Sequence, residues 1–129
     1  VLGPAHPCGE KYMSFTNARR YYLSPEIVKR FDFVEAFNSC EPVSSNSGAE
    51  KLAKKYGKVM TGGSDSHKPD CVGRGYTILP EPVTCETELI SLIRLKREEC
   101  FIIRLRRKRS ERSTSFWYIP SGFIIRAEN

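Results

Sequence analysis

Short apolar segments alternate with helix-like segments over most of this chain, and no other feature constrains its fold as strongly. Four segments have the length and composition of strands: Val1–Ala5, Phe33–Phe37, Lys58–Thr61 and Tyr76–Leu79. Helices are expected between them, starting at Ser24-Pro25-Glu26, spanning about Ser47 to Tyr56, and starting near Thr84. This alternation predicts an α/β fold with a mostly parallel sheet. Ligands of such sheets bind beyond the carboxyl ends of the strands.

The expected helices rest on end signals and on apolar spacing. Pro25 suits a first helical turn, because its φ is already helical and its missing N–H needs no partner there. The first helix would then turn Ile27, Val28 and Phe31 inward. Gly57 would end the second helix. The third carries apolar residues at helical spacing, namely Leu89, Ile90, Leu92 and Ile93.

A carboxylate and an imidazole follow the third strand candidate, in the segment Gly62-Gly63-Ser64-Asp65-Ser66-His67. Residues two apart in extended chain point to the same side, so we expect Asp65 and His67 to face one pocket. The second of the chain's two histidines, His6, follows the first strand candidate. One aspartate and two histidines at strand ends are ligands of the kind that bind zinc, manganese or iron.

The segment Gly62–Thr77, GGSDSHKPDCVGRGYT, resembles the last motif of the PHP family, the polymerase and histidinol phosphatase metal-dependent phosphoesterases. His6-Pro7, Phe33–Ser39 and Asn46–Tyr56 match the preceding motifs in order and spacing. The resemblance extends over about residues 2–97, and its specificity lies in the ordered series. It implies that His6, Asp65 and His67 are metal ligands, and that Asp65 and His67 are catalytic.

The same resemblance implies a fold and an incomplete site. The fold would be the C-terminal half of a distorted seven-stranded β/α barrel, which favours self-association or pairing with a missing N-terminal half. The family's first motif is a His-x-His pair, and its second supplies a further histidine and a bridging glutamate. This sequence has no His-x-His pair and no third histidine. We therefore expect the chain alone to hold at most one divalent ion well and to have weak or no phosphoesterase activity. The alternative is a catalytically inactive PHP module with a structural or nucleic-acid-associated role.

The substrate implied by the resemblance is a phosphorylated small molecule or a nucleotide. Lys68 and Arg74 would attract its phosphate, although basic residues on loops are often only solvated. Glu35 and Asn38 lie at the end of the second strand candidate, where they either orient a neighbouring group or close the strand end.

The C-terminal 26 residues differ in composition from the rest. Residues 1–103 carry fourteen Lys and Arg against thirteen Asp and Glu, whereas residues 104–129 carry seven against two. We expect a first domain over 1–103 and a β-rich basic tail over 104–129. The tail interleaves basic and aromatic residues, as a nucleic-acid surface requires. Alternatively, Phe101–Leu105 and Phe116–Ile119 form a hairpin that packs on the barrel.

The five cysteines indicate a reduced protein. They lie at positions 8, 40, 71, 85 and 100 without a Cys-x-x-Cys pair, and the sequence shows no secretory signal and no apolar run long enough for a membrane span. A cytoplasmic location follows. Cys8 and Cys71 lie near the presumed ligands, which allows a rival structural zinc site made of His6, Cys8, His67 and Cys71. The simpler interpretation is that the cysteines behave as small apolar residues.

Overall fold

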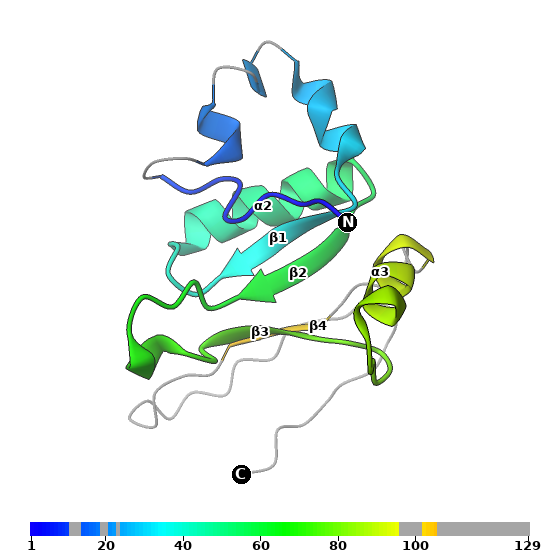
Figure 1. The fold of residues 1–129 in the computed structure, drawn as a ribbon. Coiled ribbons are helices and arrows are strands. Elements are labelled where there is room, and N and C mark those ends of the chain that lie inside the picture. The colour runs from blue at the N-terminus through cyan, green and yellow to red at the C-terminus, as the bar shows by residue number, and fades with distance from the viewer. Residues whose placement is uncertain (11–13, 19–20, 23, 96–101, 106–129) are drawn as a thin grey trace, which may run out of the picture.

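The computed structural model describes residues 1–10, 14–18, 21–22 and 24–95, together with the backbone of residues 102–105. These residues form an α/β arrangement, as predicted (Figure 1). In chain order the elements are η1 (Phe15–Asn17), η2 (Pro25–Arg30), β1 (Phe33–Asn38), α2 (Val43–Lys55), β2 (Val59–Gly63), η3 (Pro69–Cys71), β3 (Gly75–Ile78), α3 (Glu86–Leu95) and β4 (Ile102–Leu105), where η denotes a 3-10 helix. No described helix is both long and apolar enough to cross a membrane.

The centre of the fold is a β1–α2–β2 unit with parallel strands. Phe33 lies opposite Val59, and the register continues to Asn38 opposite Gly63, with an irregularity between Glu35 and Phe37. Burial alternates along β1, so that every second residue is inaccessible to solvent. This period of two is expected of a strand that turns one face to a helix.

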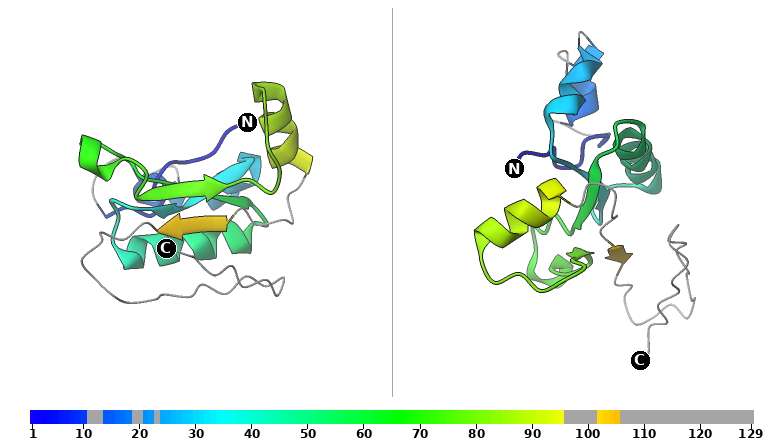
Figure 2. Two further views of the ribbon diagram at one scale, coloured as in Figure 1. Left: turned by 90° about the horizontal axis from the view of Figure 1, so that it is seen from below. Right: turned by 90° about the vertical axis from the view of Figure 1, so that its right-hand side faces the viewer.

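Two helices cover opposite sides of this strand pair (Figure 2). The helix α2 packs on β1 and has its own buried stripe of Ala49, Leu52 and Ala53. The helix α3 contributes Leu92 and Ile93 to a cluster around Val59 at the start of β2. Sheltering these apolar side chains from water on both sides is the main source of stability of such a layer.

The strand β3 joins the end of β2 through a side chain. The Thr77 hydroxyl accepts a hydrogen bond from the Gly62 N–H at 2.8 Å and donates one to the Gly62 carbonyl at 2.9 Å. The two chains approach so closely that a Cβ on Gly75 would collide with the Gly63 carbonyl oxygen and lie 2.9 Å from the Phe37 ring. Only glycine fits at position 75 without a shift of backbone.

The predicted barrel is not formed by the described residues. Their strands make one parallel pair, β1–β2, and one antiparallel pair, β3–β4, and the sheet does not close. The prediction of a mostly parallel sheet therefore holds for the first pair alone. The strand β4 falls within the predicted hairpin strand Phe101–Leu105 and pairs with β3, with Ile102 opposite Ile78. Residues 116–119 lie outside the described part of the chain.

The segment Val1–Ala5 lies along β1 but is not a strand, contrary to the prediction (Figure 1). Its carbonyl groups accept hydrogen bonds from β1 and the residue before it, as in Asp32 N–H to Leu2 O at 2.7 Å and Glu35 N–H to Pro4 O at 3.3 Å. The N–H groups of this segment do not donate hydrogen bonds to carbonyl groups of β1. Pro4 has none, and the Leu2 N–H donates to the Asp32 carboxylate at 2.8 Å. A strand ladder needs both kinds of group.

The helices follow the predicted positions with different boundaries. The segment starting at Pro25 is the 3-10 helix η2; it buries Val28 completely, whereas Ile27 and Phe31 are half-buried. The helix α2 begins at Val43, before the predicted Ser47. It ends as predicted before Gly57, which has φ +57° and supplies the left-handed turn that stops a helix.

Candidate functional site

Asp65 and His67 meet in a tight turn after β2. Asp65 has φ +46°, so the segment is a turn and not the extended chain assumed from the sequence. The turn brings the His67 Nδ1 to 2.8 Å from the Asp65 carbonyl oxygen and 3.9 Å from the Asp65 carboxylate. A carbonyl oxygen only accepts hydrogen bonds, so Nδ1 carries the proton. The other ring nitrogen, Nε2, is thereby left free on a side chain that is 82% exposed.

Residues that follow β1 fix this turn from the neighbouring strand end. The Ser39 N–H donates to the Gly63 carbonyl at 3.1 Å, and the Ser39 hydroxyl donates to the Ser64 carbonyl at 2.9 Å. The Cys40 thiol lies 3.3 Å from the carbonyl oxygens of both Ser64 and Asp65. The turn therefore lies beyond the carboxyl ends of the parallel pair, where α/β proteins bind ligands.

A buried amide supports the same strand end. Asn38 is 1% exposed, and its side-chain oxygen accepts the Cys40 N–H at 2.9 Å. Its backbone N–H and C=O both bond the side chain of Asn46 on α2, at 2.8 and 3.0 Å. A buried amide has to satisfy its donors and acceptors, and this network does so. Asn38 thus closes the end of β1, one of the two roles expected for it.

Glu35 connects this strand end to His6. Its carboxylate accepts the His6 N–H at 2.6 Å and the Asn38 side-chain N–H at 3.1 Å. His6 has φ +30°, and its ring Nδ1 is buried without a hydrogen-bond partner.

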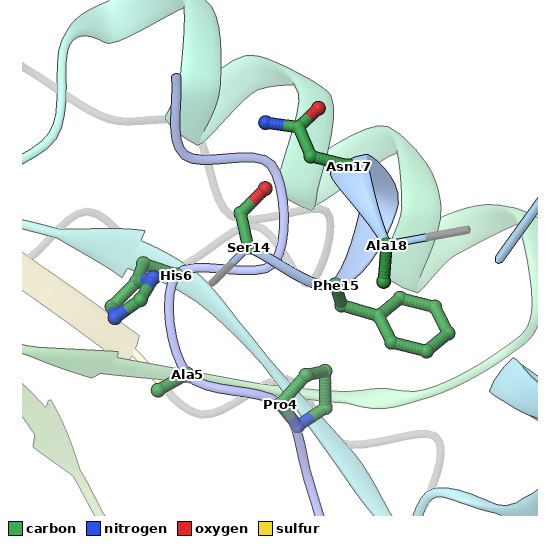
Figure 3. A pocket seen from close by; sticks show the side chains of 7 residues that line it. All are labelled: Pro4, Ala5, His6, Ser14, Phe15, Asn17 and Ala18. Atoms are coloured by element: carbon green, nitrogen blue, oxygen red, sulfur yellow. The ribbon is translucent and has the colours of Figure 1, made fainter. Parts of the chain in front are cut away.

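An open cavity of about 580 Å³ lies beside His6 (Figure 3). The Phe15 ring and the His6 ring point in opposite directions from its walls. The lining is mainly apolar and consists of Pro4, Ala5, His6, Ser14, Phe15, Asn17 and Ala18.

The predicted ligands are only partly gathered. Asp65 and His67 lie together, but within the described ranges no three His, Cys, Asp or Glu residues form a group that could hold a metal ion. His6 therefore does not complete a ligand set with them in this geometry. Its place is defined by its backbone bond to Glu35.

The rival four-ligand zinc site is not assembled either. Cys8 packs against Gly48 of α2. Cys71 is the last residue of η3, which follows the Asp65 turn in the sequence. The four described cysteines are all free thiols. Burial raises the pKa of the Cys8 thiol, as expected of a cysteine that behaves as a small apolar residue.

The two predicted phosphate-binding cations differ in their availability. The Arg74 guanidinium is committed to Asp70, with its Nε donating to the backbone carbonyl and its terminal nitrogen to the carboxylate, both at 3.1 Å. Lys68 directly follows His67 and is exposed.

Sequence reasoning did not find Ser39, Cys40 and Asn46 as parts of the site. Ser39 and Cys40 contact the Asp65 turn from about 25 residues away, and serine and cysteine at a strand end carry no specific signal. Burial raises the pKa of the Cys40 thiol above its ordinary value of 9.0, and the negative charge of Asp65 adds to this effect. Cys40 is therefore protonated at neutral pH.

A parallel strand–helix–strand unit with polar groups at its carboxyl end defines an α/β protein with a strand-end site. Residues 43–97 match the family model described as PHP-associated. This match confirms the resemblance to the C-terminal region of a PHP domain. It begins at α2 and includes β2, the turn of Asp65 and His67, β3 and α3, while His6 and Glu35 precede it. No curated protein and no solved structure matches the chain.

Proposed function

We propose that the chain contributes the Asp-x-His half of a metal-dependent phosphoesterase site of the PHP type. The observation that carries this proposal is the state of the His67 ring. Its Nδ1 donates to the Asp65 carbonyl, which selects the tautomer with a free Nε2. Metal-binding histidines are held in the same way, with one ring nitrogen bonded to a backbone carbonyl and the other on the metal.

The donor chemistry of this turn fits a divalent cation. His67 offers its Nε2 and Asp65 a carboxylate that is one-third exposed, and these donor types together suit zinc, manganese or iron. Asp65 and His67 would hold the ion, with His6 as the candidate third ligand, and water would fill the remaining positions. When bound, such an ion lowers the pKa of a coordinated water and neutralises charge on phosphoryl oxygens. The family's remaining ligand motifs have no counterpart in this sequence, so the activity expected of this chain is weak.

The charges at the turn are compatible with the phosphorylated substrate that the family resemblance implies. Lys68 is exposed next to His67 and supplies a cation for a phosphate oxygen. Arg74 already neutralises Asp70, so its attraction for a phosphate would be smaller unless that pair opens. We therefore rank Lys68 above Arg74 as the phosphate-binding residue of a phosphorylated small molecule or nucleotide.

Metal stoichiometry tests the proposal directly. Elemental mass spectrometry of the purified chain should find about one zinc, manganese or iron per molecule, because Asp65 and His67, with His6 as the candidate third ligand, can supply one ion only. His67→Ala and Asp65→Ala should lose it. Asp70→Asn, which alters a carboxylate in the same loop region outside the ligand set, should retain it. Metal that stays bound in His67→Ala would disprove the assignment.

Hydrolysis is the second readout. With manganese added, the chain should hydrolyse 4-nitrophenyl phosphate slowly, and His67→Ala should abolish the hydrolysis. Lys68→Ala should raise KM with little change in kcat, because it removes a substrate contact that is made equally in the ground state and the transition state.

The basic composition of residues 104–129, with seven Lys and Arg against two Asp and Glu, supports a second candidate, a catalytically inactive PHP module. This module would fold without metal and act as a structural domain, with the basic tail contacting nucleic acid. The distinguishing measurement is fluorescence anisotropy with single-stranded DNA at two salt concentrations. Replacement of Arg106, Arg107, Lys108 and Arg109 by Gln should weaken binding and flatten its salt dependence. A metal-free, folded chain that binds DNA in this way would favour the module over the enzyme.

A further inference from the structure

Glu35 occupies a position from which it touches both halves of the candidate site. It lies on β1, and its carboxylate turns toward the segment that precedes the strand in sequence. One oxygen, Oε2, accepts the backbone N–H of His6 at 2.6 Å. The same oxygen accepts the Asn38 side-chain N–H at 3.1 Å, so its direction is fixed from two sides.

The other carboxylate oxygen faces the end of β2. A Cβ built on Gly63 would lie 2.5 Å from Glu35 Oε1, so the carboxylate fills the space that a side chain at position 63 would need. Gly63 stands two residues before Asp65. The Glu35 carboxylate thus lies between the His6 backbone and β2, the strand that leads to the Asp-x-His turn, and it is close to both.

The bond to His6 acts on an unusual backbone conformation. His6 has φ +30°, a left-handed value that non-glycine residues rarely adopt without support from their surroundings. A charged acceptor at 2.6 Å is a strong form of such support. The same residue carries an imidazole whose Nδ1 is buried without a hydrogen-bond partner.

We propose that Glu35 is the positioning residue for His6. By accepting the His6 N–H, it holds the backbone in the left-handed conformation and thereby fixes the point from which the imidazole leaves the chain. This inference rests on the proposed function for its chemical purpose, since His6 is the candidate third ligand. The orientation itself does not depend on any bound metal.

The experiment uses the full chain and NMR of its two histidines, assigned with His6→Gln and His67→Gln. In metal-free protein, the short hydrogen bond to Glu35 should shift the signal of the His6 backbone amide proton downfield. Glu35→Ala should abolish this shift and speed the hydrogen exchange of that amide. The His6 ring signals should move while those of His67 stay in place. Glu35→Gln should restore both signatures, because a glutamine carbonyl oxygen can accept the same N–H. Glu41→Ala is the matched control: its carboxylate lies against Gly9 in the same segment but does not bond His6.

A zinc titration then measures the consequence for binding. In Glu35→Ala the His6 signals should need about tenfold more zinc to respond, the usual effect of losing a residue that orients a ligand. Unchanged His6 signals in metal-free Glu35→Ala with a well-dispersed spectrum would overturn the inference, as would equal changes in Glu41→Ala. If wild-type protein binds no zinc, the proposed function fails, and the metal-free spectra still decide the role of Glu35.

Discussion

Replacing Asn38 should test whether the strand-end network is as important to stability as its geometry indicates. Asn38→Ala removes the acceptor of the Cys40 N–H and one donor to the Glu35 carboxylate. The first bond is neutral and worth about 1 kcal/mol, and the second is charge-assisted and worth about 2 kcal/mol. The lost volume at a position that is 1% exposed adds about 1 kcal/mol.

The expected destabilisation is therefore about 4 kcal/mol, a large fraction of the roughly 5–15 kcal/mol typical of a domain. Urea unfolding followed by circular dichroism measures it. Asn17→Ala is the control, because that amide is exposed and makes one bond, to the Gly9 carbonyl at 2.9 Å. It should cost less than about 1 kcal/mol.

Asn38→Asp sharpens the test through pH. It keeps an acceptor for the Cys40 N–H but places a second carboxylate against Glu35. Two ionised carboxyls at that separation repel each other, so the folded state has to take up a proton. N38D should therefore be strongly destabilised at pH 7 and recover relative to wild type as the pH falls. A loss below about 1 kcal/mol in N38A, or no pH dependence in N38D, would refute the reasoning.

Three further predictions concern single positions. Gly75→Ala should destabilise the chain by about 2 kcal/mol in thermal unfolding, because the new methyl group collides with the Gly63 carbonyl; unchanged stability would contradict the close approach of β3 to β2. Hydrogen bonds from the Thr84 N–H and hydroxyl lower the pKa of Glu88 from 4.5. The stabilisation that these hydrogen bonds give to the folded state is complete above pH 4.5, and it is lost as the pH falls through the lowered pKa of Glu88 in the folded chain. Circular dichroism should therefore show α3 weakening below pH 4.5 in wild type and no such pH dependence in Glu88→Gln. Cys40 should react more slowly with iodoacetamide at pH 7 in the folded chain than in urea, because its raised pKa leaves little thiolate; mass spectrometry of the modified peptide measures the rate, and equal rates would argue against that shift.

The elements that local signals encode were predictable from the sequence. The strands β1 and β2 lie where short apolar segments predicted them, and Gly57 ends α2 because a left-handed residue is needed there. The segment Val1–Ala5 has equal apolar character, yet it cannot form a ladder, since Pro4 lacks an N–H and Leu2 donates its own to Asp32. Hydrophobicity alone does not reveal where backbone donors go.

The site was predictable only where its parts are close in sequence. Asp65 and His67 meet because a two-residue separation allows it, although they do so through a turn and not through extended chain. The bond between Glu35 and His6 joins positions 29 apart, and the pairing of β3 with β4 joins segments that local periodicity treats as unrelated. Contacts of this kind depend on how the whole chain packs, which residue spacing does not encode.

The Thr77 hydroxyl joins β3 to β2 by hydrogen bonds that do not depend on whether the two chains run parallel or antiparallel. A neighbouring strand would normally engage Gly62 with two peptide groups, and that arrangement fixes whether the chains run together or in opposition. One hydroxyl satisfies the same donor and acceptor and imposes neither choice. A parallel pair and an antiparallel pair can therefore share a border, and the chain changes its mode of pairing there without leaving a peptide group of Gly62 unbonded.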